Sequence, residues 1–253
     1  MSQLITTAVA GVKKIRTMQK IWRISIQHLN ELTRVAAVIL SFSGAANAAE
    51  LLIFDSPNMI MLNERDGVIG YYGSVEGDKN CEFFFYQARE SSFKEGEYSG
   101  RDISSFSFAF PPKSYRYKDR DGRFDSAGAV YSLQDQRIVR IDNPAPGCVG
   151  WAVGSFGKRP GDKYVVRYTI EKKTEAIGIR ALSKKSTFYK KIGLRFDSTR
   201  AYLVEGDVVV VLATSSTYSY VRYANPDLTS GGRVTTGWVR SADLVNPFPS
   251  AGK

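Results

Sequence analysis

Short runs of aromatic and β-branched residues, separated by turn-forming residues, make up most of the chain from Ala49 onward. The first group of runs consists of Val68–Val75, Cys81–Ala88, Ser104–Phe110, Ala127–Leu133, Arg137–Ile141, Val149–Gly154 and Lys163–Ile170. The segments between them hold the Gly, Pro, Asn and Asp residues that turns require. This spacing predicts an all-β protein whose first domain, residues 49–172, is an antiparallel β-sandwich or barrel.

Alternation within one run predicts how its strand is placed. In Ser104–Phe110, the three phenylalanines Phe106, Phe108 and Phe110 alternate with small residues. Successive side chains of a strand point to opposite faces of the sheet. We therefore expect one face of this strand to lie in the core and the other to be open.

A second unit is expected over residues 176–246, followed by a tail at 247–253. The charged segment Glu171–Ala176 indicates a linker before it. The strand-like runs of this unit include Ala201–Ala213, Thr217–Ala224 and Thr235–Leu244. Four or five short strands in so short a segment predict a small closed barrel.

The order of several short motifs in this unit resembles that of a known family. The motifs are Phe188-Tyr189, the turn Tyr202–Asp207, the strand Val208–Leu212, Val221–Tyr223, and Gly237-Trp238-Val239 followed by Leu244. Together they resemble the bacterial SH3-like domain family, with Val234–Leu244 as the last strand and a terminal 3₁₀-like turn. The resemblance implies that an aromatic groove recognises an extended peptide or a peptidoglycan stem.

The unit departs from the family pattern in two places. Tyr218 stands where the family often has Trp, and the insert Asn225–Gly232 precedes the last strand. Both changes alter the chemistry of any groove there. The N-terminal unit matches no family closely, although its aromatic strand opened by a cysteine is similar to a feature of small periplasmic inhibitor and immunity proteins.

The N-terminal segment has the pattern of a secretory signal peptide. Six Lys and Arg residues precede the apolar run Val35–Phe42, and Ala46-Asn47-Ala48 forms a small-residue cleavage site. The apolar run is much shorter than the roughly 20 residues of a spanning helix. We expect residues 1–48 to be removed between Ala48 and Ala49, with translation starting at Met1 or Met18. The mature protein is then periplasmic or secreted and is not inserted in a membrane.

Removing this segment changes the charge and the available chemistry. The whole chain has 35 Lys+Arg and 25 Asp+Glu, of which residues 1–48 hold six and one, so the mature chain carries 29 against 24. No cluster of basic residues is dense enough to follow phosphates, so nucleic acid is not an expected partner. The one histidine, His28, is also removed. This excludes Ser-His-Asp and Cys-His catalysis and His-ligated metal.

Two further patterns concern metals and carboxylate chemistry. The spacing of Asp119–Asp125 does not match a calcium loop, and an Asp-Gly hairpin turn explains it. We expect neither a metal nor a cofactor. The glutamates Glu82, Glu90, Glu95 and Glu97 lie close in sequence and leave a paired-carboxylate hydrolase open as an alternative.

The two cysteines of the mature chain, Cys81 and Cys148, are expected to form a disulfide bond. An even number of cysteines in an exported protein is typical of disulfides, and neither residue belongs to a Cys-x-x-Cys redox motif. The closed loop of about 68 residues predicts a stabilisation of roughly 4 kcal/mol in the chain-entropy model.

Aromatic residues of the second unit are the candidate ligand-binding residues. If Val221 points to the core, alternation leaves Tyr218 and Tyr220 on the outside. Trp238 is explained either as a packing residue or as a ligand-stacking residue. A basic run with Phe188 and Tyr189 at its centre is read either as a solvated loop or as an edge that contacts an anionic or peptide partner.

The combined interpretation is an exported binding protein without catalytic activity. Its expected partner is a protein, a peptide or a peptidoglycan stem, recognised by the SH3-like unit; no pattern indicates an oligomeric state. A periplasmic immunity or inhibitor protein that blocks a hydrolase with a loop, Asn225–Gly232 or Asp119–Asp125, is the alternative. A hydrolase in the first domain is a third possibility.

Overall fold

The computed structural model describes residues 49–88, 91–148, 156–227, 229 and 232–250. The predicted signal peptide and the predicted run Val149–Gly154 lie outside the described residues. Within them, the chain forms strands and short 3₁₀ turns, which confirms the all-β prediction. In this described part, no helix has the length and apolar character needed to cross a membrane.

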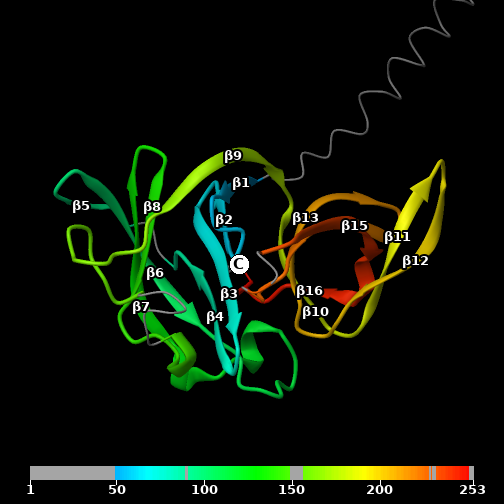
Figure 1. Cartoon of the computed structure of the whole chain (residues 1–253), viewed down its shortest axis with the longest axis horizontal. Coiled ribbons are helices and arrows are strands. Elements are labelled where there is room, and N and C mark those ends of the chain that lie inside the picture. The colour runs from blue at the N-terminus through cyan, green and yellow to red at the C-terminus, as the bar shows by residue number, and fades with distance from the viewer. Residues whose placement is uncertain (1–48, 89–90, 149–155, 228, 230–231, 251–253) are drawn as a thin grey trace, which may run out of the picture. The chain divides into compact units, whose positions relative to one another are not determined.

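The first nine strands form one sheet that closes on itself (Figure 1). They are β1 (Ala49–Phe54), β2 (Met59–Glu64), β3 (Gly67–Glu76), β4 (Lys79–Tyr86), β5 (Phe93–Glu95), β6 (Tyr98–Phe106), β7 (Ser126–Leu133), β8 (Gln136–Ile141) and β9 (Tyr168–Ala176). The sheet order is β4-β3-β2-β1-β9-β8-β7-β6-β5. Because β4 also pairs with β6, eight of these strands make a closed antiparallel barrel.

Two predicted segments have different boundaries in the structure. Strand β6 ends at Phe106, so the run Ser104–Phe110 is only partly strand. Phe108 is half-buried, whereas Phe110, which precedes a cis proline, is 94% exposed. The polar segment Glu171–Ala176, which the sequence indicated as a linker, is the second half of strand β9 and pairs with β1.

The remaining strands form a second sheet that curves into a half-barrel (Figure 1). They are β10 (Gly178–Leu182), β11 (Ser186–Ile192), β12 (Arg195–Leu203), β13 (Val208–Ser215), β14 (Tyr218–Ala224), β15 (Val234–Arg240) and β16 (Leu244–Val245). Their order is β12-β11-β15-β14-β13-β10-β16. The 3₁₀ turn Ser241–Asp243 follows β15, where the sequence predicted such a turn.

The strands that begin the barrel are buried on both faces. Along β1, Leu52 and Phe54 point into the barrel, whereas Leu51 points to its outside. Side chains of the second sheet cover this outer face and form one core with it. The second sheet contributes Ile179, Ala181, Val208 and Val210 to this core, and the barrel contributes Leu51, Ile60, Leu62, Phe84 and Phe106. Two-sided burial explains why Met59–Leu62 is apolar without interruption.

Two segments outside the strands strengthen this junction. Phe248, in the predicted tail, is 7% exposed and packs edge-on against Phe84 and Phe106. The insert after β14 contacts the barrel as well, because the carbonyl oxygen of Pro226 accepts a hydrogen bond of 2.8 Å from the Val75 backbone N–H. Pro226 and Asp227 of this insert are therefore docked on β3.

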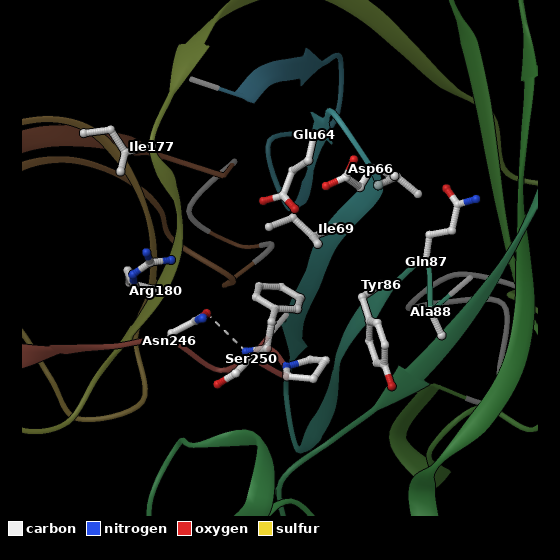
Figure 2. A pocket seen from close by; sticks show the side chains of 14 residues that line it. Glu64, Asp66, Ile69, Tyr86, Gln87, Ala88, Ile177, Arg180, Asn246 and Ser250 are labelled. Carbon is white, nitrogen blue, oxygen red and sulfur yellow. Dashed lines mark hydrogen bonds between the residues drawn. The ribbon is translucent and has the colours of Figure 1, made fainter. Parts of the chain in front are cut away.

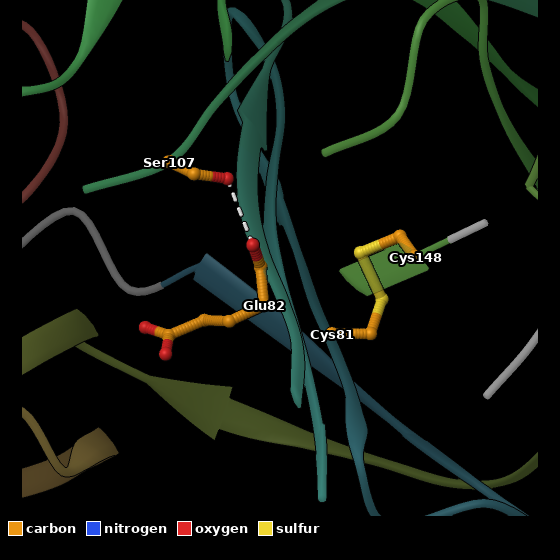
Figure 3. The surroundings of a disulfide bond; sticks show 4 residues. All are labelled: Cys81, Glu82, Ser107 and Cys148. Carbon is orange, nitrogen blue, oxygen red and sulfur yellow. Dashed lines mark hydrogen bonds between the residues drawn. A yellow bond between two sulfur atoms is a disulfide. The ribbon is translucent and has the colours of Figure 1, made fainter. Parts of the chain in front are cut away.

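The predicted disulfide between Cys81 and Cys148 is present (Figure 3). Cys81 lies on β4 and Cys148 in the 3₁₀ turn Pro146–Cys148, and both are buried in the barrel interior. The neighbouring side chain of Glu82 extends away from the disulfide, to the other face of the strand (Figure 3). Glu82 thus faces the outside of the barrel.

Candidate functional site

Aromatic and basic side chains meet on the outer face of the second sheet because of strand register. Trp238 on β15 is the direct cross-strand partner of Tyr189 on β11 and of Tyr220 on β14. In the same way, Tyr218 pairs with Arg240, and Lys191 pairs with Phe196 of β12. Directly opposed residues share one face of a sheet. We call this set of seven side chains the aromatic–basic face.

The rings of the aromatic–basic face contact one another continuously. Phe196 stacks on Tyr218 at 4.0 Å between ring centroids, and Tyr218 meets Tyr189 edge-on at 4.9 Å. Trp238 lies 5.4 Å from Phe196 and 5.2 Å from Tyr220. The tyrosine hydroxyl of Tyr220 also donates to Thr236 Oγ1 at 3.1 Å. These contacts hold the rings in fixed orientations while they remain half-exposed.

Two cations complete this face. The Lys191 ammonium lies 5.2 Å from the centroid of Trp238 and 5.7 Å from that of Phe196, and it donates to Ser215 Oγ at 2.8 Å. The guanidinium of Arg240 lies 5.8 Å from the centroid of Tyr189. Both cations are within the distance of cation–π attraction, and both are exposed. An anionic ligand could reach them without displacing an ion pair to any other residue that the structure describes.

A groove of about 500 Å³ runs beside the rings. Its walls include Tyr189, Lys191, Tyr220 and Trp238, and its rim is polar, with Thr199, Thr235 and Thr236. Phe188 forms its floor but is only 5% exposed and packs in the interior of the half-barrel. Phe188 therefore supports the groove from below and offers a ligand less surface than its neighbours do.

The other predicted positions occupy the expected faces. Val221 is fully buried and packs against Val209 and Val239, and the alternate residues Tyr218 and Tyr220 lie on the surface. Trp238 is half-exposed, so it both packs and presents ring surface. At the start of the loop Asn225–Gly232, Pro226 and Asp227 pair with Val75 of the barrel.

Sequence reasoning missed Phe196 and Arg240. Arg240 could have been found from its register, two residues after Trp238 on the same face of the strand. Phe196 could not, because strand β12 reaches Tyr218 across β11 and β15 only through the curvature of the sheet.

A larger hollow of about 520 Å³ lies where the barrel meets the second sheet (Figure 2). Glu64 and Asp66 from the β2–β3 hairpin face it, and Arg180 of β10 enters from the other side (Figure 2). Burial raises the pKa of Glu64, and the positive charge of Arg180 opposes this shift. The negative charges of Glu64 and Asp66 and the positive charge of Arg180 partly cancel in this hollow. The hollow therefore attracts a charged ligand less strongly than the aromatic–basic face does.

The clustered glutamates of the sequence do not act together. Glu95 on β5 is 3.7 Å from Arg159, and Glu97 lies at the exposed β5–β6 turn. Glu82 faces a separate cavity beside the second sheet, with Asp207 as its charged neighbour. Glu90 lies outside the described residues.

Comparison with known proteins gives no relative for this chain: no family model, no curated protein and no solved structure matches it.

Proposed function

We propose that this protein is a non-catalytic binding protein of the cell envelope that holds an extended, carboxylate-bearing peptide on its aromatic–basic face. The observation that carries the proposal is the convergence of five rings and two cations on one solvent-facing surface, where neither cation forms an ion pair with another described residue. A peptidoglycan stem peptide is the source implied by the resemblance to SH3-like domains.

The packing of the rings against one another favours binding. Half-exposed rings that already contact one another lose little conformational entropy when a ligand covers them. The ring surfaces offer apolar contact, and the tyrosine hydroxyls can hydrogen-bond to an extended backbone. Lys191 and Arg240 stand beside these rings, where they can pair with carboxylates of the ligand.

The charge distribution points to the same unit. Residues 176–246 hold ten Lys and Arg against five Asp and Glu, whereas residues 49–175 hold 18 against 19. The net positive charge of the mature chain is therefore concentrated in the second unit. Such an asymmetry steers anionic partners toward the positive side of a molecule and makes their association dependent on salt.

The two candidate loops of the inhibitor alternative are both held locally. In the first, Pro226 and Asp227 pair with Val75 of the barrel. The other segment, Asp119–Asp125, is fixed by ion pairs between Arg120 and Asp125 and between Arg123 and Asp121. The inhibitor alternative would operate through one of these two segments.

Sedimentation with purified peptidoglycan sacculi tests the proposal. We expect residues 49–253 to pellet with sacculi, less so in 0.5 M salt, and Trp238→Ala to remain largely in the supernatant. Tyr202→Ala is the matched control, because Tyr202 is an exposed aromatic residue of the same sheet outside the aromatic–basic face. A wild-type protein that stays soluble, or a Trp238→Ala variant that pellets equally well, would overturn the proposal.

A further inference from the structure

An acidic, tyrosine-lined cavity of about 210 Å³ lies between the barrel and the second sheet, on the side of β4 that faces away from the disulfide. Glu82 enters it from β4, and Glu205 and Asp207 enter it from the turn before β13. Tyr71, Tyr115 and Tyr223 supply aromatic walls. A neighbouring hollow of about 330 Å³ shares Glu82 and Tyr115 with it, so the two spaces adjoin.

The negative charge in this cavity is not balanced by the protein. Neither hollow is lined by a Lys or Arg residue within the part of the chain that the structure describes. Asp207 accepts hydrogen bonds from the Val204 backbone N–H at 2.7 Å and from the Tyr223 hydroxyl at 3.0 Å, both of which are neutral donors. For the carboxylate of Glu82, no hydrogen bond or ion pair is found among the described residues.

Glu82 is partly exposed, and its side chain lines both hollows. Burial, and secondarily the charge of Asp207, raises the pKa of Glu82 to about 7. Burial and the charges of Glu82, Glu205 and Asp207 likewise raise the pKa of Tyr115 to about 12. A partly buried carboxylate beside a second carboxylate is stabilised in its charged form when a cation joins it.

We propose that this cavity binds the ammonium group of a small organic cation, between the carboxylates of Glu82 and Asp207 and among the side chains of Tyr71, Tyr115 and Tyr223. An alkylammonium group matches both parts of the lining, since carboxylates attract its charge and tyrosine side chains offer hydroxyl acceptors and polarisable rings. The volume admits a small aliphatic amine or the end of a lysine side chain.

The lining favours an organic cation over a metal ion. A hard cation such as Ca²⁺ takes six to eight oxygen ligands. Among the described residues, no group of three His, Cys, Asp or Glu side chains is placed to hold a metal. Much of the remaining wall is apolar, with Val75, Phe110, Val208, Ala224 and Pro226, and gives such an ion little in exchange for its water. The ammonium site goes beyond the peptide-binding proposal and does not depend on it.

Calorimetric titration of the full mature protein with n-butylammonium chloride tests this site. The titration is made in phosphate buffer, and a titration with NaCl of equal ionic strength is the control. We expect saturable binding at pH 8 that weakens about 10-fold at pH 6, because Glu82 is then largely protonated. Asp207, Glu205 and the three tyrosines are the other titratable groups facing Glu82, and the tyrosines stay neutral over this range.

The variants separate the site from the rest of the surface. Glu82→Gln keeps the shape of the side chain and should weaken binding at least 10-fold and remove its pH dependence, while Glu95→Gln, an acidic control on β5, should bind like wild type. Parallel titrations with Nα-acetyl-lysine amide, whose ε-ammonium group is free, distinguish a lysine side chain of a peptide from a small free amine. Three results would overturn the proposal: the wild type does not bind the amine, Glu82→Gln binds it as tightly as the wild type, or Ca²⁺ binds more tightly than the amine.

Discussion

The ring of Phe196 lies almost parallel to the ring of Tyr218, with 4.0 Å between their centroids and 12° between their planes. The two residues come from strands β12 and β14, which are separated in the sheet by β11 and β15. The stack therefore ties the β11–β12 hairpin to the body of the half-barrel. It also sets one border of the aromatic–basic face.

This stack should contribute measurably to stability. Aromatic pairs contribute about 0.5–1.5 kcal/mol beyond the area they bury. In a double-mutant cycle of Phe196→Ala and Tyr218→Ala, we expect a coupling free energy of unfolding in that range. Denaturant titration of the two single variants and the double variant measures it. A cycle between Tyr202→Ala and Tyr218→Ala should show no coupling, and equal coupling in both cycles would contradict the stacked arrangement.

Phe248 should be as important for stability as a residue of a central strand. Its ring is buried against Phe84 and Phe106, so Phe248→Ala is expected to lower the free energy of unfolding by about 3–5 kcal/mol. Phe110→Ala is the control: that ring is 94% exposed, and its removal should change stability by less than about 0.5 kcal/mol. Similar melting temperatures for the two variants would show that the last residues do not close the shared core.

Reduction of the disulfide should destabilise the barrel. Cys81 and Cys148 are 67 residues apart in sequence, and the chain-entropy model assigns a loop of this size roughly 4 kcal/mol. Urea unfolding with and without a reductant measures the difference. The Cys81→Ser/Cys148→Ser variant should give a similar loss. An unchanged midpoint after verified reduction would contradict this account.

Glu82 should make stability fall as the pH rises toward neutrality. Its pKa is about 7 in the folded protein and near the ordinary glutamate value when unfolded, so the folded state holds more protons between these values. Stability therefore decreases from about pH 4.5 to pH 7 and levels off above, by up to about 3 kcal/mol from this group. Glu82→Gln should equal wild type at low pH and exceed it at pH 8. A difference of the opposite sign would show that Glu82 has a cationic partner.

Local patterns in the sequence predicted the strands and the faces of several residues. Alternation placed Val221 in the core and Tyr218 and Tyr220 outside, because a strand has a fixed period of two. The cysteine count predicted the disulfide for a similarly simple reason. These features depend on neighbours in the chain or on composition alone.

Features that depend on the packing of the two sheets were not predictable in this way. The polar segment Glu171–Ala176 reads as a linker because most of its side chains are exposed, yet its backbone pairs with β1. For the same reason, the sequence did not predict the burial of Phe248 or the proximity of Glu82 to Asp207. These residues are distant in sequence, and only the shared core of the barrel and the half-barrel brings them together.

The most direct test of peptide binding by the aromatic–basic face is the dissociation constant of a soluble, carboxylate-bearing stem peptide. Trp238 reports it by fluorescence in a Trp151→Phe background, since these are the two tryptophans of residues 49–253. Tyr218→Ala/Tyr220→Ala should weaken binding by about 2 kcal/mol, or roughly 30-fold, while Tyr202→Ala leaves it unchanged. If the double variant stays folded and binds the peptide as tightly as the background protein, the aromatic–basic face is not the binding site.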